Sequence, residues 1–292
     1  MDRIKTSAAL GIFDGVHTGH RAVIANAAKH RIDGAEPCVF TFSPDTALFK
    51  GADGFIYGEC EKNQIIGKSC GVEKIYSESF ADICSLDGES FVKEILCGKL
   101  NVAYVSCGRD FRFGKGASCG AEELAQFGRK YGFETETADD VCVSGERVSS
   151  TLIRRLVKDG EMEKAAEYLG EPYAIFKKVT HGAQLGRTIG YPTANQVFEK
   201  GQLVPRFGVY ASKVYIDGKC FSAMTNVGIK PTVDYDGMPL AETYIDGFNG
   251  DIYEKNIHTA LIRFIRPEMK FSSLGELKNQ IAEDIRCAVK LI

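Results

Sequence analysis

The sequence predicts two domains of different fold class: a doubly wound, Rossmann-like α/β domain, followed by a small antiparallel β-barrel with a terminal helix. Two observations indicate this division. Up to Gly170, short apolar runs alternate with helical patterns, which is typical of crossover connections and a parallel sheet covered on both faces. From Tyr173 the hydrophobic pattern repeats every second residue, which indicates short antiparallel strands.

In the first half, apolar runs predict strands and 3.6-residue spacings predict helices. Val23, Ile24, Ala27 and Ala28, for example, share one face of a helix. The predicted strands are 8–13, 38–42, 74–76 and 102–105. The predicted helices are 20–29, 61–70, 89–96 and 124–131.

A helix pair is expected to close the first half. The helices 151–158 and 161–169 each end at a glycine, Gly160 and Gly170, the residue that most readily adopts the left-handed conformation after a helix. Pro172 prevents the second helix from continuing. We therefore predict a domain boundary between residues 171 and 172, which gives domains 1–171 and 172–292.

The second half is predicted to contain strands 209–216, 220–225 and 258–265. Asp217-Gly218 between the first two is a strong hairpin signal. At the end of the chain, Ser273 and Glu276 have the spacing of a capping box, so a final helix is expected there.

Composition excludes several classes of protein. The net charge of −3 and the pI near 6.0 argue against a protein that binds nucleic acid, which normally needs a basic face. No apolar run is long enough to span a membrane, and the first residues do not resemble a signal peptide, so we expect a cytoplasmic protein. The ten cysteines contain no C-x-x-C pair, and we expect them to be small buried hydrophobic residues. Composition does not indicate the oligomeric state.

The densest group of functional residues lies between the first strand and the first helix, over residues 11–20. Gly11, Gly15 and Gly19 flank Phe13 and Asp14 there, and such a loop lets backbone amides approach a phosphate at the helix N-terminus.

His17 and His20 lie in the same turn, where imidazole groups can donate hydrogen bonds to charge that develops on phosphorus. Simple helix capping is the alternative role. It is less favoured because two of the five histidines in the chain fall in this one turn.

Two more segments fit an anion site in the same domain. Ser149, Ser150 and Thr151 place hydroxyl groups at the start of a helix, and Arg154 lies one turn further on. Ordinary capping with a solvated arginine is the alternative. Asp110 follows strand 102–105, and ligands of doubly wound sheets bind beyond the carboxyl ends of the strands.

The second half contains a separate set of polar loop residues. Gly182, Gly186 and Arg187 belong to a glycine-rich basic loop, and Pro192 precedes Thr193 and Asn195. Threonine and asparagine oxygens are hard ligands that suit Mg²⁺ carried by ATP phosphates. An ordinary polar loop with an Asx-turn is the alternative.

Asn226 and Glu242 are two further candidates in the second half. Asn226 begins a rigid polar segment, 226–232, whose composition predicts a turn. Glu242 lies in a strand-like stretch among apolar neighbours and is a candidate general base. An exposed strand carboxylate is the alternative.

Five of these segments, in order, resemble the motifs of the bacterial bifunctional riboflavin kinase/FMN adenylyltransferase (FAD synthetase) family. Segment 11–20 is similar to GxFDGxHxGH, 108–114 to GxDFxFG and 148–154 to [IV]SSTxIR of the adenylyltransferase. Segment 186–195 is similar to GRxxG[FY]PTAN and 226–232 to NxGxxPT of the kinase. The resemblance covers nearly the whole chain.

The resemblance implies an enzyme that binds riboflavin, FMN and ATP, with Mg²⁺ as cofactor. It implies that Glu242 is the base of the kinase, with Thr193 and Asn195 holding the metal. It further implies that His17, His20 and Arg154 stabilise charge in the adenylyltransferase. The remaining residues named above are then expected to bind the nucleotide or the flavin.

Departures from the family motifs leave alternatives open. The family's TFxPHP is Thr-Phe-Ser-Pro-Asp-Thr over 41–46, so Asp45 replaces a histidine. Tyr244, Gly247 and Asn249 also differ from the kinase motif. The alternatives are a kinase whose adenylyltransferase half is impaired, a nucleotidyltransferase for a non-flavin phosphate, and a flavin carrier without catalysis.

Overall fold

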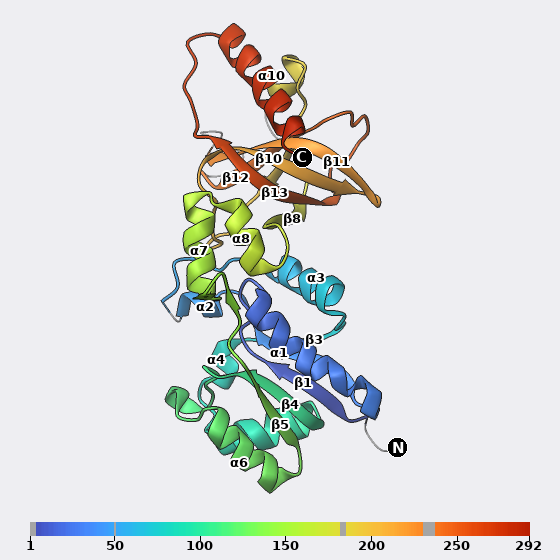
Figure 1. The fold of residues 1–292 in the computed structure, drawn as a ribbon, viewed down its shortest axis with the longest axis vertical. Coiled ribbons are helices and arrows are strands. Elements are labelled where there is room, and N and C mark those ends of the chain that lie inside the picture. Colours follow the sequence, from blue (N-terminus) through green and yellow to red (C-terminus); the bar gives the residue numbers. More distant parts are fainter. Residues whose placement is uncertain (1–3, 50, 182–184, 230–236) are drawn as a thin grey trace. The chain divides into compact units, whose positions relative to one another are not determined.

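A computed structural model describes residues 4–49, 51–181, 185–229 and 237–292 (Figure 1). The chain divides into two compact units, Met1–Ser150 and Thr151–Ile292. Because the helix pair before residue 170 belongs to the second unit, the boundary expected between residues 171 and 172 stays a prediction. Among the described residues, no helix is long and apolar enough to cross a membrane.

The first unit is built on a five-stranded parallel sheet with strand order β3-β2-β1-β4-β5. The strand order reverses between β1 and β4, which is the position where doubly wound sheets bind ligands. The strands are β1 (Thr6–Leu10), β2 (Glu36–Phe42), β3 (Lys74–Glu78), β4 (Val102–Gly108) and β5 (Glu134–Ala138), with a separate ribbon of β6 (Cys142–Val143) and β7 (Glu146–Arg147).

Helices connect the strands of this sheet and cover it. The helices are α1 (Thr18–Lys29), α2 (Thr46–Phe49), α3 (Glu59–Cys70), α4 (Phe80–Ile83), α5 (Gly88–Ser90) and α6 (Ala121–Tyr131), with η1 (His30–Asp33) and η3 (Lys115–Ala117) as 3₁₀ turns and η2 (Phe91–Lys99) as a π-helix. Leu10 belongs to one core with Leu96 and Leu124, and Ala9 belongs to another with Ile24 and Ile66. Consecutive residues of β1 therefore face opposite layers, as expected for a sheet that is buried on both faces.

The first strand is shorter than its apolar run suggests. It ends at Leu10 instead of residue 13, because Phe13 adopts a positive φ of 52° that no strand accommodates. The sequence also gave no indication of β5, whose residues are mostly polar and whose burial is incomplete. As an edge strand, β5 is defined by pairing with β4 and not by its own hydrophobic pattern.

The second unit is a six-stranded antiparallel sheet with strand order β8-β13-β10-β11-β12-β9. Its two edges meet, because the Thr180 amide donates to the Asn195 carbonyl at 2.9 Å, so the sheet curls into a barrel. Gln196 also bridges the edges, donating to the carbonyls of Lys177 and Ile257 at 3.0 Å each. The elements are α7 (Ser150–Asp159), α8 (Met162–Leu169), β8 (Ala174–Lys178), α9 (Leu185–Thr188), β9 (Ala194–Val197), β10 (Gly208–Ile216), β11 (Lys219–Ile229), β12 (Pro239–Ile245), β13 (Asn256–Arg266) and α10 (Leu274–Lys290).

The hairpin between β10 and β11 is confirmed. Ile216 pairs with Lys219, and Asp217 and Gly218 both have positive φ, as a two-residue primed turn requires. The turn predicted to start at Asn226 is wrong within the described residues. β11 continues to Ile229 because it pairs on one side with β10 and on the other with β12; residues 230–232 of that motif lie outside the described residues.

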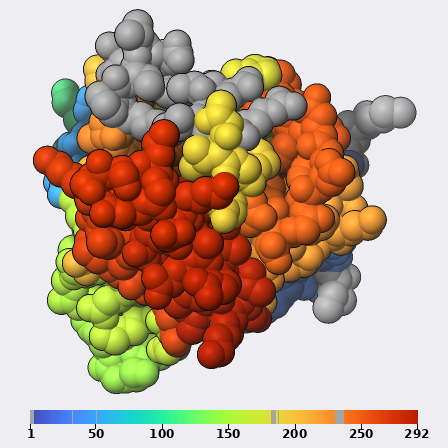
Figure 2. All heavy atoms as spheres, turned by 90° about the horizontal axis from the view of Figure 1, so that it is seen from above, coloured from blue at the N-terminus to red at the C-terminus, as the bar shows by residue number. Residues whose placement is uncertain are grey.

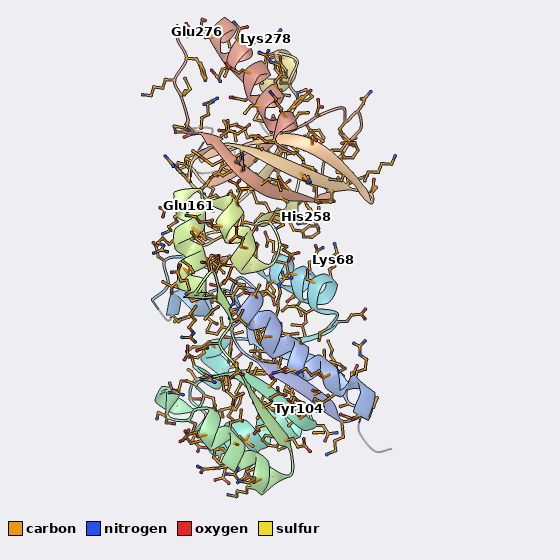
Figure 3. The ribbon with its side chains drawn as sticks, viewed as in Figure 1. Lys68, Tyr104, Glu161, His258, Glu276 and Lys278 are labelled. Atoms are coloured by element: carbon orange, nitrogen blue, oxygen red, sulfur yellow. The ribbon has the colours of Figure 1, made fainter. Side chains whose placement is uncertain are left out.

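Helices α8 and α10 pack on the barrel strands. Glu163 of α8 accepts from the Nε of Arg263 on β13 at 2.7 Å. The buried Asp284 of α10 forms a two-point ion pair with Arg266 of β13, at 2.9 and 2.6 Å. α10 forms part of the face seen in Figure 2, and the end that carries Glu276 and Lys278 points away from the strands (Figure 3).

The capping box predicted for this helix is half confirmed. Ser273 caps the Glu276 amide, but the Glu276 carboxylate accepts from Ser272 instead of Ser273.

The expectation for the cysteines is largely wrong. All ten are free thiols, but only Cys38 and Cys107 are buried. Burial raises the pKa of each of these two thiols to about 11. Four others are exposed, since a single sulfur atom on a polar helix or turn carries too little apolar surface to enforce burial.

Candidate active sites

The loop after β1 has a strained conformation that its glycines permit. Phe13, Gly15 and Val16 all have positive φ, at 52°, 87° and 41°, and such strain is concentrated at functional sites. A side chain at Gly11 would begin 2.9 Å from the Phe13 ring, and one at Gly15 would begin 2.8 Å from Ile56. The loop thus accommodates no side chain at either glycine, and it leads directly into the N-terminus of α1.

His17 and His20 form a pair at the start of α1, as their spacing predicts. His17 caps the helix, since its Nδ1 accepts from the His20 amide at 3.2 Å. The two rings are stacked, with centroids 3.5 Å apart, and a side chain at Gly19 would begin 3.3 Å from the His17 ring. His17 therefore caps the helix, which was the alternative role predicted for it, and its ring also stacks on that of His20.

The surroundings of the pair favour a neutral His20 ring. Burial, His17 and Lys62 together hold the pKa of His20 well below its ordinary value of 6.5. The Nδ1 atom of His20 is buried and has no hydrogen-bond partner among the described residues. A buried, unpaired ring nitrogen at a helix N-terminus is a polar atom available to a ligand.

Asp14 and Ser150 hold the loop in place. The buried Asp14 carboxylate accepts from the Ile56 amide at 2.8 Å, and the Asp14 carbonyl accepts from the Ser150 hydroxyl at 2.8 Å. Ser149 directly precedes Ser150, while Thr151 and Arg154 lie on α7 in the second unit. The structure thus brings Ser150 to the glycine loop.

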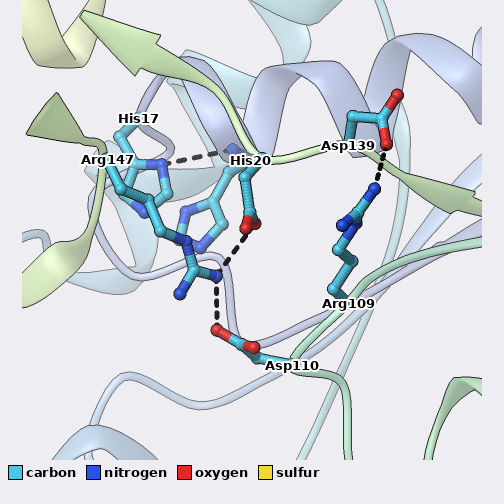
Figure 4. A network of polar contacts seen from close by, with 7 residues as sticks. His17, His20, Arg109, Asp110, Asp139 and Arg147 are labelled. Atoms are coloured by element: carbon cyan, nitrogen blue, oxygen red, sulfur yellow. Dashed lines mark hydrogen bonds and ion pairs between the residues drawn. The ribbon is translucent and has the colours of Figure 1, made fainter. Parts of the chain in front are cut away.

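Charged residues surround the ends of β4 and β5. Arg147 contacts Asp110 at 2.5 Å and Asp140 at 3.0 Å, while Arg109 contacts Asp139 at 2.5 Å. Figure 4 shows these ion pairs together with the histidine pair. Asp110 was predicted, whereas Arg147 was missed, although its position immediately before motif 148–154 could have drawn attention to it.

Lys62 is a second residue that the sequence analysis missed. Its side chain is only 2% exposed and donates to the Thr41 hydroxyl and the Phe42 carbonyl, at the carboxyl end of β2. The available signal was its spacing, four residues before the fully buried Ile66 on the same helix. That spacing places both side chains on the buried face of α3.

In the second unit, three predicted residues lie in one row across neighbouring strands. Asn195 on β9 pairs with Glu242 on β12, and Glu242 pairs with Asn226 on β11. Residues directly opposite each other on antiparallel strands share a face of the sheet. The barrel therefore places the candidate base between two asparagines that come from distant parts of the chain.

A cavity of about 470 Å³ opens beside this row. Pro192, Thr193, Asn195 and Glu242 line it, together with Gly186. Its aromatic side includes Tyr244, whose ring packs edge-on against Tyr191 with centroids 5.7 Å apart. A cavity with both polar and aromatic walls suits a ligand that is partly aromatic and partly phosphorylated.

The chemistry of the donor set fits a divalent cation. The Asn195 Oδ1 atom is buried and lacks a hydrogen-bond donor among the described residues, and Thr193 lines the same cavity. Two neutral oxygens and a nearby carboxylate suit Mg²⁺, which keeps several waters and substrate phosphates as its other ligands.

The structure places the predicted glycine-rich basic loop only in part. Gly186 is closely packed, since a side chain there would begin 2.3 Å from the carbonyl oxygen of Tyr191. The Tyr191 amide in turn donates to the Gly186 carbonyl at 2.7 Å. Arg187 belongs to α9, and Gly182 lies outside the described residues.

Comparison with known proteins gives each unit a counterpart. Residues 1–152 match the family model described as FAD synthetase, and residues 169–292 match the one described as riboflavin kinase. A bifunctional riboflavin kinase/FMN adenylyltransferase of Pseudomonas fluorescens is 33% identical over 289 residues, covering 96% of this chain and 91% of the relative. This chain belongs to the bifunctional riboflavin kinase/FMN adenylyltransferase family.

Other members of the family are similarly related. The protein of the same name from Escherichia coli K12 is 34% identical, covering 94% of this chain and 89% of the relative. A crystal structure described as a macrolide-efflux protein from Streptococcus pneumoniae has a TM-score of 0.82 and 31% identity, covering 99% of this chain and 95% of that one. That description concerns the Streptococcus protein, and the likeness shows that both chains share one fold over nearly their whole length.

The positions that depart from the family motifs occur in both units. Asp45 is exposed directly before α2, and its carbonyl accepts from the Leu48 amide at 2.9 Å. Tyr244 and Asn249 line the barrel cavity, whereas Gly247 forms a turn with positive φ after β12. These departures leave the His17–His20 pair and the row containing Glu242 intact.

Proposed function

We propose that this chain converts riboflavin to FMN in its barrel and FMN to FAD in its α/β unit, using ATP in both steps. The observation that carries the proposal is that each unit, matched by its own family model, holds a separate set of phosphate-directed groups. The histidine pair belongs to the first unit, and the row through Glu242 belongs to the second.

In the kinase step, Glu242 is the proposed general base. It accepts the proton of the ribityl 5′-hydroxyl as that oxygen forms a bond to the γ-phosphorus of ATP. The bond from this phosphorus to the bridging oxygen breaks, and ADP leaves with the electron pair. The asparagines on either side of Glu242 position it from neighbouring strands, and positioning is the main contribution of a protein to phosphoryl transfer.

Thr193 and Asn195 are the proposed protein ligands of Mg²⁺. When bound, the ion neutralises charge on the ATP phosphates. The unpaired, buried Asn195 oxygen supports this role. Gly186 and Arg187, with Gly182, are proposed to cover the phosphates, and Pro192 to keep Thr193 in place at the cavity wall.

In the adenylylation step, a phosphate oxygen of FMN attacks the α-phosphorus of a second ATP, and pyrophosphate leaves. The nucleophile is already an anion, so no strong base is needed. His17 and His20 are proposed to donate hydrogen bonds to the crowded oxygens. The lowered pKa of His20 keeps its ring neutral near pH 7, so the ring donates a hydrogen bond without carrying a full charge. Arg154 of motif 148–154 is proposed to supply that charge.

Product chromatography tests the proposal. Riboflavin, ATP and Mg²⁺ should yield FMN first and then FAD. FMN alone would indicate an impaired adenylyltransferase half, as the Asp45 departure allows, and neither product would indicate a flavin carrier. We further propose that the protein acts in the cytoplasm and binds no nucleic acid, in line with its slightly acidic composition.

A further inference from the structure

Lys62 has an unusual environment for a lysine. Its side chain is 2% exposed, and its ammonium donates to Thr41 Oγ1 at 3.1 Å and to the Phe42 carbonyl at 2.5 Å. No carboxylate forms an ion pair with it in the part of the chain that the structure describes. An ammonium group has three donors, so one remains without a protein acceptor there. A buried cation without a paired anion is unfavourable unless a ligand supplies the anion.

The position of this cation connects it to the glycine loop. Thr41, which accepts from Lys62, donates through its own hydroxyl to the Ile12 carbonyl at 2.8 Å. Ile12 lies between Gly11 and the strained Phe13. A chain of hydrogen bonds therefore runs from α3 through the end of β2 to the loop in which we propose that ATP phosphates bind.

Electrostatic interactions connect the ammonium group with charged and titratable groups of this loop and of α1. Burial lowers the pKa of Lys62 to about 8, opposed by the carboxylates of Glu59 and Asp14. Lys62 in turn contributes to the lowered pKa of His20. The charged and titratable groups around Lys62 are thus Glu59 on its own helix, Asp14 in the loop and His20 on α1. β2 contributes only neutral oxygens.

We propose that Lys62 is a further positioning residue for FMN adenylylation, which holds the Gly11–Gly15 loop through Thr41 and attracts the triphosphate of ATP to it. This inference rests on the proposed function of the first unit. A charge acts more strongly where water is excluded, so the binding of ATP and of pyrophosphate should depend on it.

A purely structural role predicts a different response to substitution. Lys62→Met keeps most of the volume and removes an unpaired buried charge, so the temperature of unfolding should stay equal or rise. The KM for ATP in FMN adenylylation should rise at least tenfold in the same variant. If Lys62 served only to stabilise the fold, the temperature of unfolding and the FAD-forming activity would fall together.

The experiment uses the full chain and compares Lys62→Met with Lys62→Arg and Lys5→Met. Lys5 is exposed and directly precedes β1, at the amino end of the strand, whereas the glycine loop follows its carboxyl end. The Lys5→Met variant should therefore match the wild type. Lys62→Arg keeps the charge and should lose less FAD formation than Lys62→Met. Riboflavin phosphorylation should remain within twofold of wild type in all three variants. If Lys62→Met is poorly folded, Lys62→Gln takes its place.

The pH profile provides a readout that a structural role would not move. Because the folded-state pKa is near 8, below the ordinary 10.5, the ammonium loses its charge as pH rises through 8. The kcat/KM for ATP, which reports free-enzyme pKa values, should decrease above pH 8, and this decrease should move to higher pH in Lys62→Arg. The free energy of unfolding should change in the opposite direction. The contribution of Lys62 to it should increase between pH 8 and 10.5, as the buried charge disappears.

Calorimetry with inorganic pyrophosphate separates this inference from the proposed function. Weaker pyrophosphate binding by Lys62→Met than by wild type supports the role of Lys62, even if the wild type forms no FAD. The absence of FAD would refute only the proposed function. Unchanged pyrophosphate binding and an unchanged KM for ATP would overturn the inference. So would Lys62→Arg losing as much FAD formation as Lys62→Met while both remain folded.

Discussion

The two units position phosphate-directed groups in different ways. In the α/β unit, a strained glycine loop and the first turn of one helix supply the histidine pair from a single stretch of chain. In the barrel, Asn195, Glu242 and Asn226 come from three strands and meet only through antiparallel register. A site built from one loop can be predicted from a local motif, whereas a site built across strands depends on pairing that no single motif contains.

The largest effect is expected in the barrel, where replacing Glu242 should remove most of the kinase activity. Glu242→Gln keeps the shape and polarity of the side chain but removes its basicity, so the ribityl hydroxyl keeps its proton. FMN formation should decrease by roughly 10²–10⁴-fold, the usual value of general-base assistance. The measurement is the initial rate of riboflavin phosphorylation, with riboflavin binding measured as a control. A near-normal rate would show that Glu242 is an ordinary strand carboxylate without a catalytic role.

A smaller loss of activity is expected at the N-terminus of α1, where several groups donate hydrogen bonds to the transition state. His20→Ala removes one donor to the transition state and should lower FAD formation from FMN by about 10²–10³-fold. His17→Ala should have a weaker effect on the rate, but it should also lower the temperature of unfolding, because His17 caps α1. The double variant, assayed at limiting enzyme, should stop at FMN; an undiminished FAD yield would remove both residues from the mechanism.

Separating the units tests whether the barrel site is complete by itself. A fragment of residues 172–292 should fold and phosphorylate riboflavin without forming FAD. A fragment of residues 151–292 should unfold at a higher temperature, because α8 packs on the barrel and Glu163 contacts Arg263. A folded 172–292 fragment that forms no FMN would contradict the assignment of the kinase to the barrel.

The smallest effect is expected at Asp45, the departure in the α/β unit. Its side chain is exposed, and surface substitutions usually change the free energy of unfolding by less than about 0.5 kcal/mol. Asp45→His should therefore leave stability nearly unchanged. A large gain in FAD formation would show instead that the wild-type adenylyltransferase is impaired at this position.

Much of the fold follows from periodicity, and the failures have identifiable causes. The core strands of the α/β unit and the Asp217-Gly218 hairpin were predictable from local patterns. β5 was missed because its edge position allows a polar composition. Asn226 was predicted to start a turn because its neighbours are turn residues, but pairing with β10 and β12 extends the strand through it.

The same distinction applies to the sites. The histidine pair and the candidate metal ligands belong to recognisable motifs, and the structure shows their surroundings. Lys62 was missed because a lysine on a helix is normally solvated, and its four-residue spacing from Ile66 was the one local sign that it lies on the buried face of α3. Its contact with Thr41 joins residues 21 positions apart, which no sequence spacing indicates.

The central claim is that the two reactions take place at separate active sites, and four rates test it most directly. Riboflavin phosphorylation and FMN adenylylation are measured separately on full-length Glu242→Gln and His20→Ala. Glu242→Gln should lose only the first activity, and His20→Ala only the second, each with the other rate close to wild type. Loss of both activities in either folded variant would contradict the existence of two independent sites.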